Sequence, residues 1–193
     1  METRKGKPFV TVSGLPGSGK TTLARRLAPA IGLPLIDKDD ILDRLFELKG
    51  VGDSEWRRTL SRESDRVLQQ EALLSTGAVL VSFWHLPGMP SDSGTPVDWL
   101  SAPSHRLVNV HCVCSREIAA ERFSQRRRHP GHLDDARSHA DLVANLETLA
   151  RLPPLDLGRR IEVDTTCEWV LDDVVRKVLE SLGNLIDSSQ GQL

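Results

Sequence analysis

Residues 14–22 of this 193-residue chain read GLPGSGKTT, and their types and spacing suit the binding of phosphate. Gly14, Gly19, Lys20 and Thr21 fill the pattern GxxxxGK(S/T) of a P-loop, between a β-rich run and an amphipathic helical pattern. Glycines let backbone N–H groups approach phosphate oxygens, and the start of a helix adds free N–H groups and the positive end of its dipole. In this pattern the lysine reaches the β- and γ-phosphates and the threonine hydroxyl binds Mg²⁺. The other predicted phosphate contacts are Pro16, Gly17, Ser18 and Thr22.

A cluster of carboxylates, Asp37, Asp39 and Asp40, follows the apolar run 33–37. Strands of open α/β sheets bind ligands at their carboxyl ends, so the cluster is expected near the P-loop. If the extended conformation persists, Asp37 and Asp39 point the same way and both face the γ-phosphate. A carboxylate there could accept the proton of an attacking hydroxyl. The alternative is an acidic helix start favoured by the helix dipole, a role that suits Asp40 best.

Short apolar runs and helical patterns alternate along the chain, which predicts a parallel sheet covered by helices on both faces. The expected strands are 8–14, 33–37, 78–84, 106–114 and 160–166. Amphipathic helices are expected at 21–31, at 54–76, from Ser115 onward, at 136–150 and at 168–182. Two stretches, 85–96 and 126–135, are long enough as loops to suggest function.

The composition is that of an ordinary globular protein, with 39% hydrophobic and 27% charged residues. A net charge of −2 provides no general attraction to nucleic acid or to an anionic membrane. No apolar run has the length of a membrane span or a signal peptide, so we expect a cytoplasmic protein. The length predicts one domain, residues 1–183, followed by a frayed tail at 184–193.

The stretch GLPGSGKTTLARRLA, followed by LPLIDKDDI, resembles the Walker A motif, first helix and second strand of the small P-loop kinases. This group, the AAA_33 type, includes gluconate and shikimate kinases, chloramphenicol phosphotransferase and the zeta-toxin type kinases. The resemblance continues through ERFSQRRRHPGHLDD and IEVDTT and covers most of residues 8–180. It implies a three-layer P-loop fold with a five-stranded parallel sheet in the order 2-3-1-4-5, and a lid at about residues 124–136.

The resemblance also implies ATP and Mg²⁺ as cofactors and a role for each residue of the aspartate pair. Asp37, with Thr21, is expected on the metal side, and Asp39 is expected to contact the acceptor hydroxyl as the general base. Ser82 stands where many P-loop proteins carry a Walker B aspartate, so metal binding is expected to rest on Thr21 and Asp37 through water. Asp164 and Thr165 correspond to the segment that flanks the adenine in these kinases.

Arg122 and Arg126 lie four residues apart, on one face of the helix expected from Ser115. In the similar kinases this is the lid, whose arginines stabilise the charge on the transferring phosphoryl group, and guanidinium suits that task because it stays charged. Arg126 is the first choice and Arg122 the second, since the helical register favours them over the loop. A solvated basic helix end is the alternative.

The acceptor pocket is expected between Asp39, the helical insertion after Ile41 and the end of the third strand. Arg57, Arg58, Trp84 and His85 are the candidates for acceptor contacts, against surface or packing roles.

The leading hypothesis is a kinase, monomeric or homodimeric, whose acceptor is a small metabolite, sugar, nucleoside or antibiotic. The alternatives are a regulatory or switch-type P-loop ATPase that acts on a protein partner and, less favoured by the mild net charge, a nucleic-acid 5′-end kinase.

Overall fold

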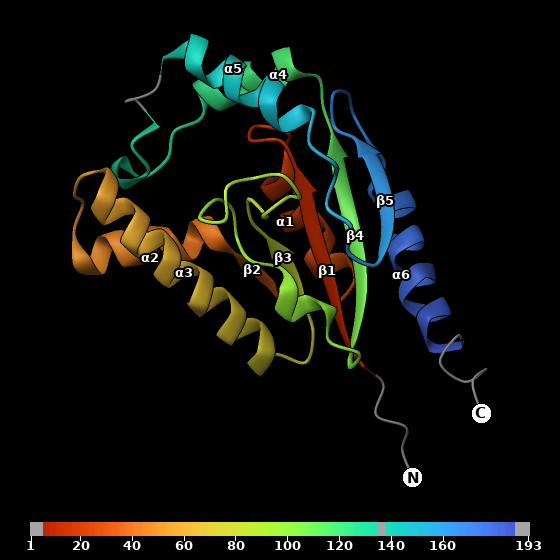
Figure 1. The fold of residues 1–193 in the computed structure, drawn as a ribbon. Coiled ribbons are helices and arrows are strands. Elements are labelled where there is room, and N and C mark those ends of the chain that lie inside the picture. The colour runs from red at the N-terminus through yellow and green to blue at the C-terminus, as the bar shows by residue number, and fades with distance from the viewer. Residues whose placement is uncertain (1–5, 135–137, 188–193) are drawn as a thin grey trace.

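A five-stranded parallel sheet forms the centre of the computed structural model, which describes residues 6–134 and 138–187 (Figure 1). The strands are β1 (Lys7–Gly14), β2 (Leu35–Asp37), β3 (Ala78–Val81), β4 (His105–Val113) and β5 (Arg159–Asp164). Their order is β2-β3-β1-β4-β5 and every pairing is parallel, which confirms the predicted fold class. The first strand along the chain is therefore central, and its carboxyl end opens into the loop that begins at Gly14.

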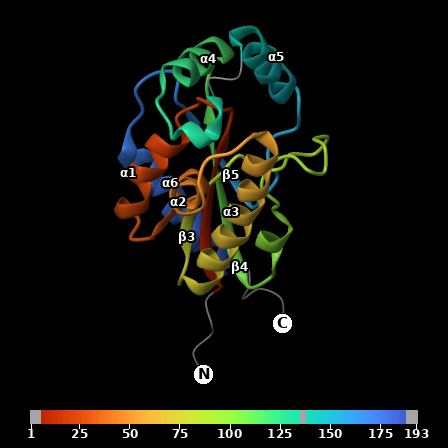
Figure 2. The same cartoon turned by 90° about the vertical axis from the view of Figure 1, so that its left-hand side faces the viewer.

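Helices cover both faces of the sheet, as Figures 1 and 2 show. The helices α1 (Lys20–Ala30) and α6 (Leu171–Asp187) cover one face, and α2 (Lys38–Lys49) and α3 (Ser54–Leu74) cover the other. Side chains alternate between the faces along β1, so Val10 and Val12 belong to the apolar cluster that includes α1 and α6, while Phe9 belongs to the cluster that includes α2 and α3. Each face thus buries its own apolar layer.

A smaller pair of helices, α4 (Arg116–Gln125) and α5 (His139–Ala150), lies beyond the carboxyl edge of the sheet (Figure 1). They pack on each other through a third apolar cluster that includes Phe123 and Leu146. Two short 3₁₀ turns, η1 (Asp98–Ser101) and η2 (Pro130–His132), complete the described elements. Within the described ranges, no helix combines the length and apolar character needed to cross a membrane.

Several predicted boundaries differ from the structure. The strands predicted at 33–37 and 78–84 are shorter, because β2 begins at Leu35 and the chain leaves the sheet after Val81 to form a bridge between Trp84 and Thr95. The helix predicted at 136–150 begins at His139, and residues 135–137 lie outside the described part. The last helix continues to Asp187, into the segment predicted as a tail, whose residues 188–193 also lie outside it.

Candidate active site

The P-loop between β1 and α1 has a backbone that requires glycine. Gly17 and Gly19 have φ angles of +81° and +86°, in the left-handed region that L side chains rarely adopt. A Cβ atom on Gly17 would also lie 2.1 Å from the carbonyl oxygen of Ala119. The glycines therefore allow α4 to pack directly against the loop.

The first turn of α1 is open to an anion. Gly19 precedes the helix, and among the described residues no side chain caps its first N–H groups. Lys20 lies across the loop and donates from Nζ to the carbonyl oxygens of Gly14 (3.0 Å) and Leu15 (2.9 Å). Burial lowers the pKa of Lys20 to about 8, so an anion bound beside it would restore its affinity for the proton.

Thr21 and Asp37 form the pair of oxygen donors next to the P-loop. The Thr21 hydroxyl donates to Asp37 Oδ2 at 3.0 Å. Burial, together with the neighbouring Asp39, raises the pKa of Asp37 to about 6. A hydroxyl and a carboxylate are the hard donors that Mg²⁺ prefers, with waters and phosphates as its other ligands. Among the described residues, no three acidic, histidine or cysteine side chains gather as they would for a metal held by side chains alone.

The extended conformation does not persist from Asp37 to Asp39, and the acidic cluster forms a helix start, which was the alternative. Asp37 is the N-cap of α2 and accepts the backbone N–H of Asp39 at 3.0 Å, which places Asp39 in the first helical turn. Both carboxylates nevertheless line the same cavity, because the N-terminus of α2 opens toward the P-loop. Asp40 also lies in this first turn, where it pairs with Arg25 at 3.1 Å.

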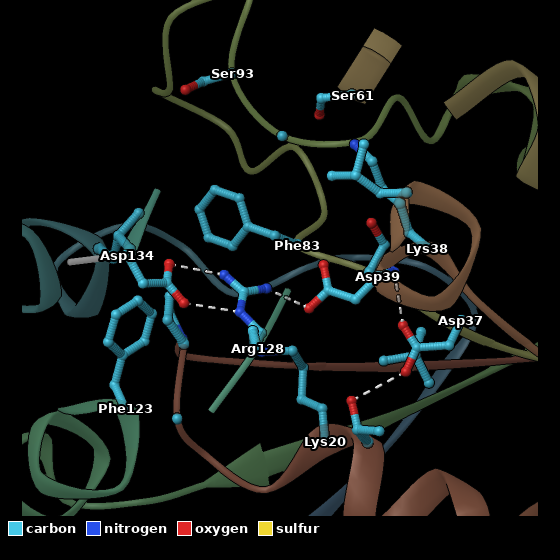
Figure 3. Close-up of a pocket in the computed structure, with 18 of the residues that line it drawn as sticks. Lys20, Asp37, Lys38, Asp39, Ser61, Phe83, Ser93, Phe123, Arg128 and Asp134 are labelled. Carbon is cyan, nitrogen blue, oxygen red and sulfur yellow. Dashed lines mark hydrogen bonds and ion pairs between the residues drawn. The ribbon is translucent and has the colours of Figure 1, made fainter. Parts of the chain in front are cut away.

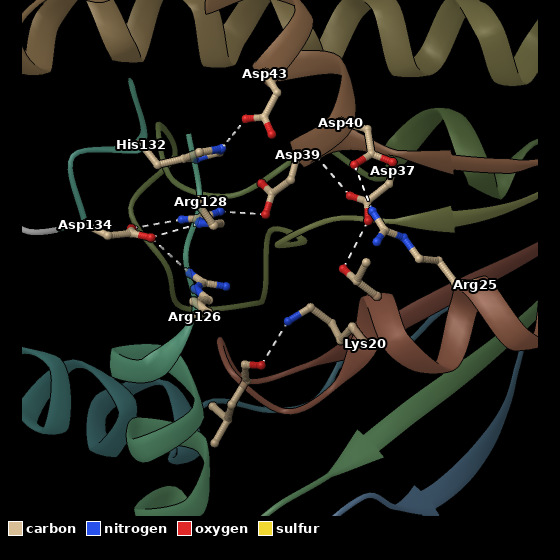
Figure 4. A network of polar contacts seen from close by, with 12 residues as sticks. Lys20, Arg25, Asp37, Asp39, Asp40, Asp43, Arg126, Arg128, His132 and Asp134 are labelled. Atoms are coloured by element: carbon tan, nitrogen blue, oxygen red, sulfur yellow. Dashed lines mark hydrogen bonds and ion pairs between the residues drawn. The ribbon is translucent and has the colours of Figure 1, made fainter. Parts of the chain in front are cut away.

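Arg128 is the partner of Asp39, a contact that the sequence did not indicate. Its Nη1 lies 2.6 Å from Asp39 Oδ2, while Nε and Nη2 donate to Asp134 at 2.8 and 2.9 Å (Figure 4). Burial favours a raised pKa for Asp39, but the positive charges of Arg128, His132 and Arg126 outweigh it and hold the pKa below its ordinary value. Asp39 is therefore ionised at neutral pH.

Arg122 and Arg126 both line the cavity, but not from one helical face as predicted. The helix α4 ends at Gln125, and Arg126 follows it with an extended backbone. The guanidinium of Arg126 lies 3.8 Å from the centroid of the Phe123 ring and 3.6 Å from Asp134. Arg122 donates to the backbone carbonyl of Thr165 at 2.8 Å.

A second contact ties the segment after α4 to α2. His132 in η2 is 1% exposed, and its Nε2 lies 2.7 Å from Asp43 Oδ1 (Figure 4). Its ring also packs edge-on against Phe46. Together with Arg128 and Asp39, this contact docks residues 126–134 on the N-terminal half of α2.

A buried polar network lies just after β3. It includes Ser82, which stands at the position of the Walker B aspartate of many P-loop proteins. The Ser82 hydroxyl bonds to that of Thr95, and Thr95 donates to Asp65 Oδ1 at 2.7 Å. Lys38 Nζ lies 2.6 Å from the same Asp65 oxygen and 3.2 Å from Thr95. The network joins α2, α3, β3 and the loop 85–96.

Two predicted acceptor contacts lie elsewhere. Trp84 is 2% exposed and belongs to the core, where its Nε1 donates to the Val12 carbonyl at 2.9 Å. His85 is bonded through Nδ1 to the Ser93 carbonyl at 2.7 Å and does not line the cavity. Arg57 and Arg58 do line it.

On the nucleotide side, Pro16, Gly17, Gly19 and Thr22 line the cavity beside Lys20 and Thr21. The remaining predicted contacts, Gly14, Ser18, Asp164 and Thr165, do not. Thr165 instead supports the loop from the side of the sheet, since its hydroxyl donates to the carbonyl oxygens of Ser18 (2.7 Å) and Val113 (2.9 Å).

The P-loop, Asp37, Asp39, Arg122, Arg126 and Arg128 all line one cavity of about 1400 Å³, which is large enough for a nucleotide and a second small molecule. In Figure 3, Lys20 lies on one side of it, and Ser61 of α3 and Ser93 of the loop 85–96 lie on the opposite side. Asp39 and Arg128 lie between them. We call the side of the P-loop the donor half, and the side formed by α3 and the loop 85–96 the acceptor half.

The sheet order, the glycine-dependent loop and the open N-terminus of α1 define a nucleotide-binding P-loop protein of the small kinase type. A family model described as an AAA domain (AAA_33) matches residues 9–154, and the chain belongs to this family. The prediction that the chain is similar to the small P-loop kinases is thereby confirmed.

Individual relatives agree with this placement. A shikimate kinase of Corynebacterium glutamicum is 40% identical over 73 residues, which are 37% of this chain and 43% of that protein. A cytidylate kinase of Ignicoccus hospitalis is 31% identical over 123 residues, which are 61% of this chain and 63% of that protein. The chain thus spans less than two thirds of the length of these curated relatives. The crystal structure of a candidate kinase from Chloroflexus aurantiacus is 27% identical, covers 93% of this chain and 98% of its own, and has a TM-score of 0.71.

Proposed function

We propose that the chain is an ATP-dependent kinase that transfers the γ-phosphate of ATP to a hydroxyl of a small molecule. The observation that carries the proposal is the single cavity in which the P-loop and the ionised carboxylate of Asp39 both lie. Similarity to proteins named shikimate kinase and cytidylate kinase supports phosphoryl transfer to a small molecule.

On the donor half, Lys20 would exchange the carbonyls of Gly14 and Leu15 for phosphate oxygens, which are stronger acceptors because they are charged. The free N–H groups at the start of α1 would hold a further phosphate oxygen. Thr21 and Asp37 would hold Mg²⁺, and the ion, when bound, neutralises charge on the phosphates.

On the acceptor half, Asp39 would accept the hydrogen bond of the incoming hydroxyl and take its proton as that oxygen attacks phosphorus. Arg128 keeps Asp39 ionised and holds it toward the cavity. Arg122 and Arg126, which line the cavity on the side of α4, would stabilise charge on the transferring group. The chain thus contributes mainly position and charge, which is what phosphoryl transfer requires of a protein.

The lid is the described part of the predicted segment, residues 124–134, within a single catalytic domain. It is anchored on α2 by the contacts of Arg128 with Asp39 and of His132 with Asp43. A lid held there excludes water between the two substrates.

The test is ADP release measured with ATP, Mg²⁺ and a panel of hydroxylated metabolites, sugars, nucleosides and antibiotics. The proposal predicts that at least one acceptor stimulates ADP release and that a phosphorylated acceptor accumulates in equal amount. ATP hydrolysis that no acceptor changes, but that a protein partner does, would instead support a regulatory ATPase.

A further inference from the structure

The wall of the cavity that α3 provides carries positive charge. Arg57, Arg58, Ser61 and Arg62 line the cavity from two successive turns of this helix. Arg58 and Arg62 stand four residues apart, a spacing at which like charges disfavour a helix slightly. Within the described part of the chain, no hydrogen bond or ion pair engages the guanidinium of Arg58.

Arg62 is only partly neutralised. Its nearest carboxylate oxygen, Asp65 Oδ2, lies 3.6 Å away, while the other oxygen of Asp65 lies 2.6 Å from Lys38 Nζ. One buried carboxylate therefore faces two cations, and Lys38 is its closer partner. The side chain of Arg62 is 39% exposed, so its guanidinium remains accessible from the cavity.

The carboxylates that line the cavity do not balance this wall. Three of them are engaged elsewhere: Asp40 by Arg25, Asp43 by His132, and Asp134 by Arg126 and Arg128. Asp39 is held by Arg128, and Asp37 accepts hydrogen bonds from Thr21 and from the backbone of α2. Asp92, exposed on the loop 85–96, forms no ion pair with Arg58 or Arg62 in the described structure. The surplus positive charge of α3 is thus left to a ligand.

We infer that the acceptor carries an anionic group, a carboxylate or a phosphate ester, which binds to Arg58 and Arg62 while its hydroxyl contacts Asp39. Guanidinium groups bind both kinds of anion through paired N–H donors, and Ser61 offers a hydroxyl donor between them. An anion there also relieves the repulsion between the two arginines. The inference rests on the proposed function, because it names the acceptor class of that site.

The placement of this wall argues against a role in ATP binding. Ser61, which lies on the same face of α3 as Arg58 and Arg62, is on the side of the cavity opposite Lys20, with Asp39 and Arg128 between them (Figure 3). The donor half has its own cations, Lys20, Arg122 and Arg126. An anion on α3 and the γ-phosphate at the P-loop would therefore lie on opposite sides of the attacking hydroxyl.

The experiment compares alcohols that differ only in charge. One arm pairs sugar acids with the corresponding sugar alcohols, and the other pairs sugar phosphates and nucleoside monophosphates with the uncharged sugars and nucleosides. We expect kcat/KM for ADP release to be at least about tenfold higher for the anionic member in one arm, which also identifies the anion as carboxylate or phosphate. Equal use of the charged and uncharged members would overturn the inference and leave the proposed kinase function intact.

Substitutions of the two arginines test whether the anionic group of the acceptor binds to them. We expect Arg58→Ala and Arg62→Ala each to raise the KM of the anionic acceptor about tenfold or more, with the KM of ATP changed less than about twofold. Arg58→Lys retains the charge and should recover part of the loss. Arg66→Ala is the matched control, because Arg66 is exposed two turns further along α3 and does not line the cavity.

Two results would count against the site. A rise in the KM of ATP rather than of the acceptor would assign the arginines to the nucleotide and overturn the inference. ATP hydrolysis that no acceptor of either arm stimulates would overturn the proposed function, and this inference with it.

Discussion

The donor and acceptor halves of the cavity are built by different means. The centre of the donor half is the run of consecutive P-loop residues, whose backbone would bind the phosphates with Lys20 and Thr21 as the added side chains. The acceptor half is assembled from side chains of α2, α3, the loop 85–96 and residues 128–134, held together by ion pairs such as that of Arg128 with Asp39. A backbone cradle binds any nucleotide phosphate, whereas an assembly of side chains can be altered one residue at a time to suit a different acceptor.

The largest effect is expected from Lys20→Met in the donor half. The variant loses the only charge that the P-loop itself directs at the phosphates, so we expect kcat/KM for ADP release to fall about 10³-fold or more. ATP should also lose most of its effect on the melting temperature. Lys49→Met, at an exposed ion pair with Glu63 far along α2, is the control. Near-normal turnover by Lys20→Met would contradict the proposed role of the P-loop in binding the phosphates of ATP.

Asp39→Asn should impair the acceptor half while leaving ATP binding at the donor half intact. Without a carboxylate to accept the hydroxyl proton, turnover should fall about 10²- to 10³-fold, while the shift of melting temperature caused by ATP remains. Asp40→Asn removes the neighbouring charge, which pairs with Arg25, and should keep most of the activity. Equal losses in both variants would mean that net charge, and not the position of Asp39, governs the reaction.

Asp65→Asn tests the assembly of the acceptor half through stability. It leaves the buried ammonium of Lys38 without its carboxylate, which we expect to lower the free energy of unfolding by about 3 kcal/mol. Chemical denaturation measures the change. Adding Lys38→Met should restore part of it, since both charges are then gone. A loss below about 0.5 kcal/mol for Asp65→Asn would show that this ion pair does not hold the half together.

Asp37→Asn is expected to have the smallest effect on the free energy of unfolding, a gain, while activity falls because Asp37 would help to hold Mg²⁺. The pKa of Asp37 is raised to about 6 in the folded protein, so above pH 6 its ionised carboxylate lowers the free energy of unfolding. This destabilisation disappears as pH falls toward 3.8, the ordinary pKa of an aspartate. Asparagine avoids it, so the variant should be more stable than wild type by about 2 kcal/mol at pH 8, and by almost nothing near pH 4. Melting temperatures without Mg²⁺ measure this difference. A gain that does not depend on pH would contradict the assigned cause.

The sequence predicted the fold and the donor half because their signals are local. Apolar runs and helical spacings define the strands and helices, and the glycines of residues 14–22 are needed by the backbone of that same stretch. The pairing order of the strands came from the resemblance to small kinases, and the structure confirms it.

The acceptor half was predicted less well because its contacts join distant segments. Arg128 and Asp39 are 89 residues apart, and helical register favoured Arg122 and Arg126 over the loop that contains Arg128, although the helix ends at Gln125. Trp84 resembled a ligand contact because it ends a strand, but its ring fills the core beneath α2 and α3. The acidic Asp134 that follows the run of arginines was the one available signal for the partner of Arg128.

The N-cap of α2 fixes the position of Asp39 relative to Asp37. Asp37 lies beside the P-loop and Asp39 is the proposed base for the acceptor, and a single hydrogen bond of 3.0 Å within one helical turn relates them. A residue inserted between the two aspartates would turn the second one about 100° around the helix axis and carry it out of line with the phosphate. In the proposed mechanism, acceptor preference can therefore change through the side chains of α3 and the loop 85–96, whereas a change in the interval from Asp37 to Asp39 would abolish the reaction.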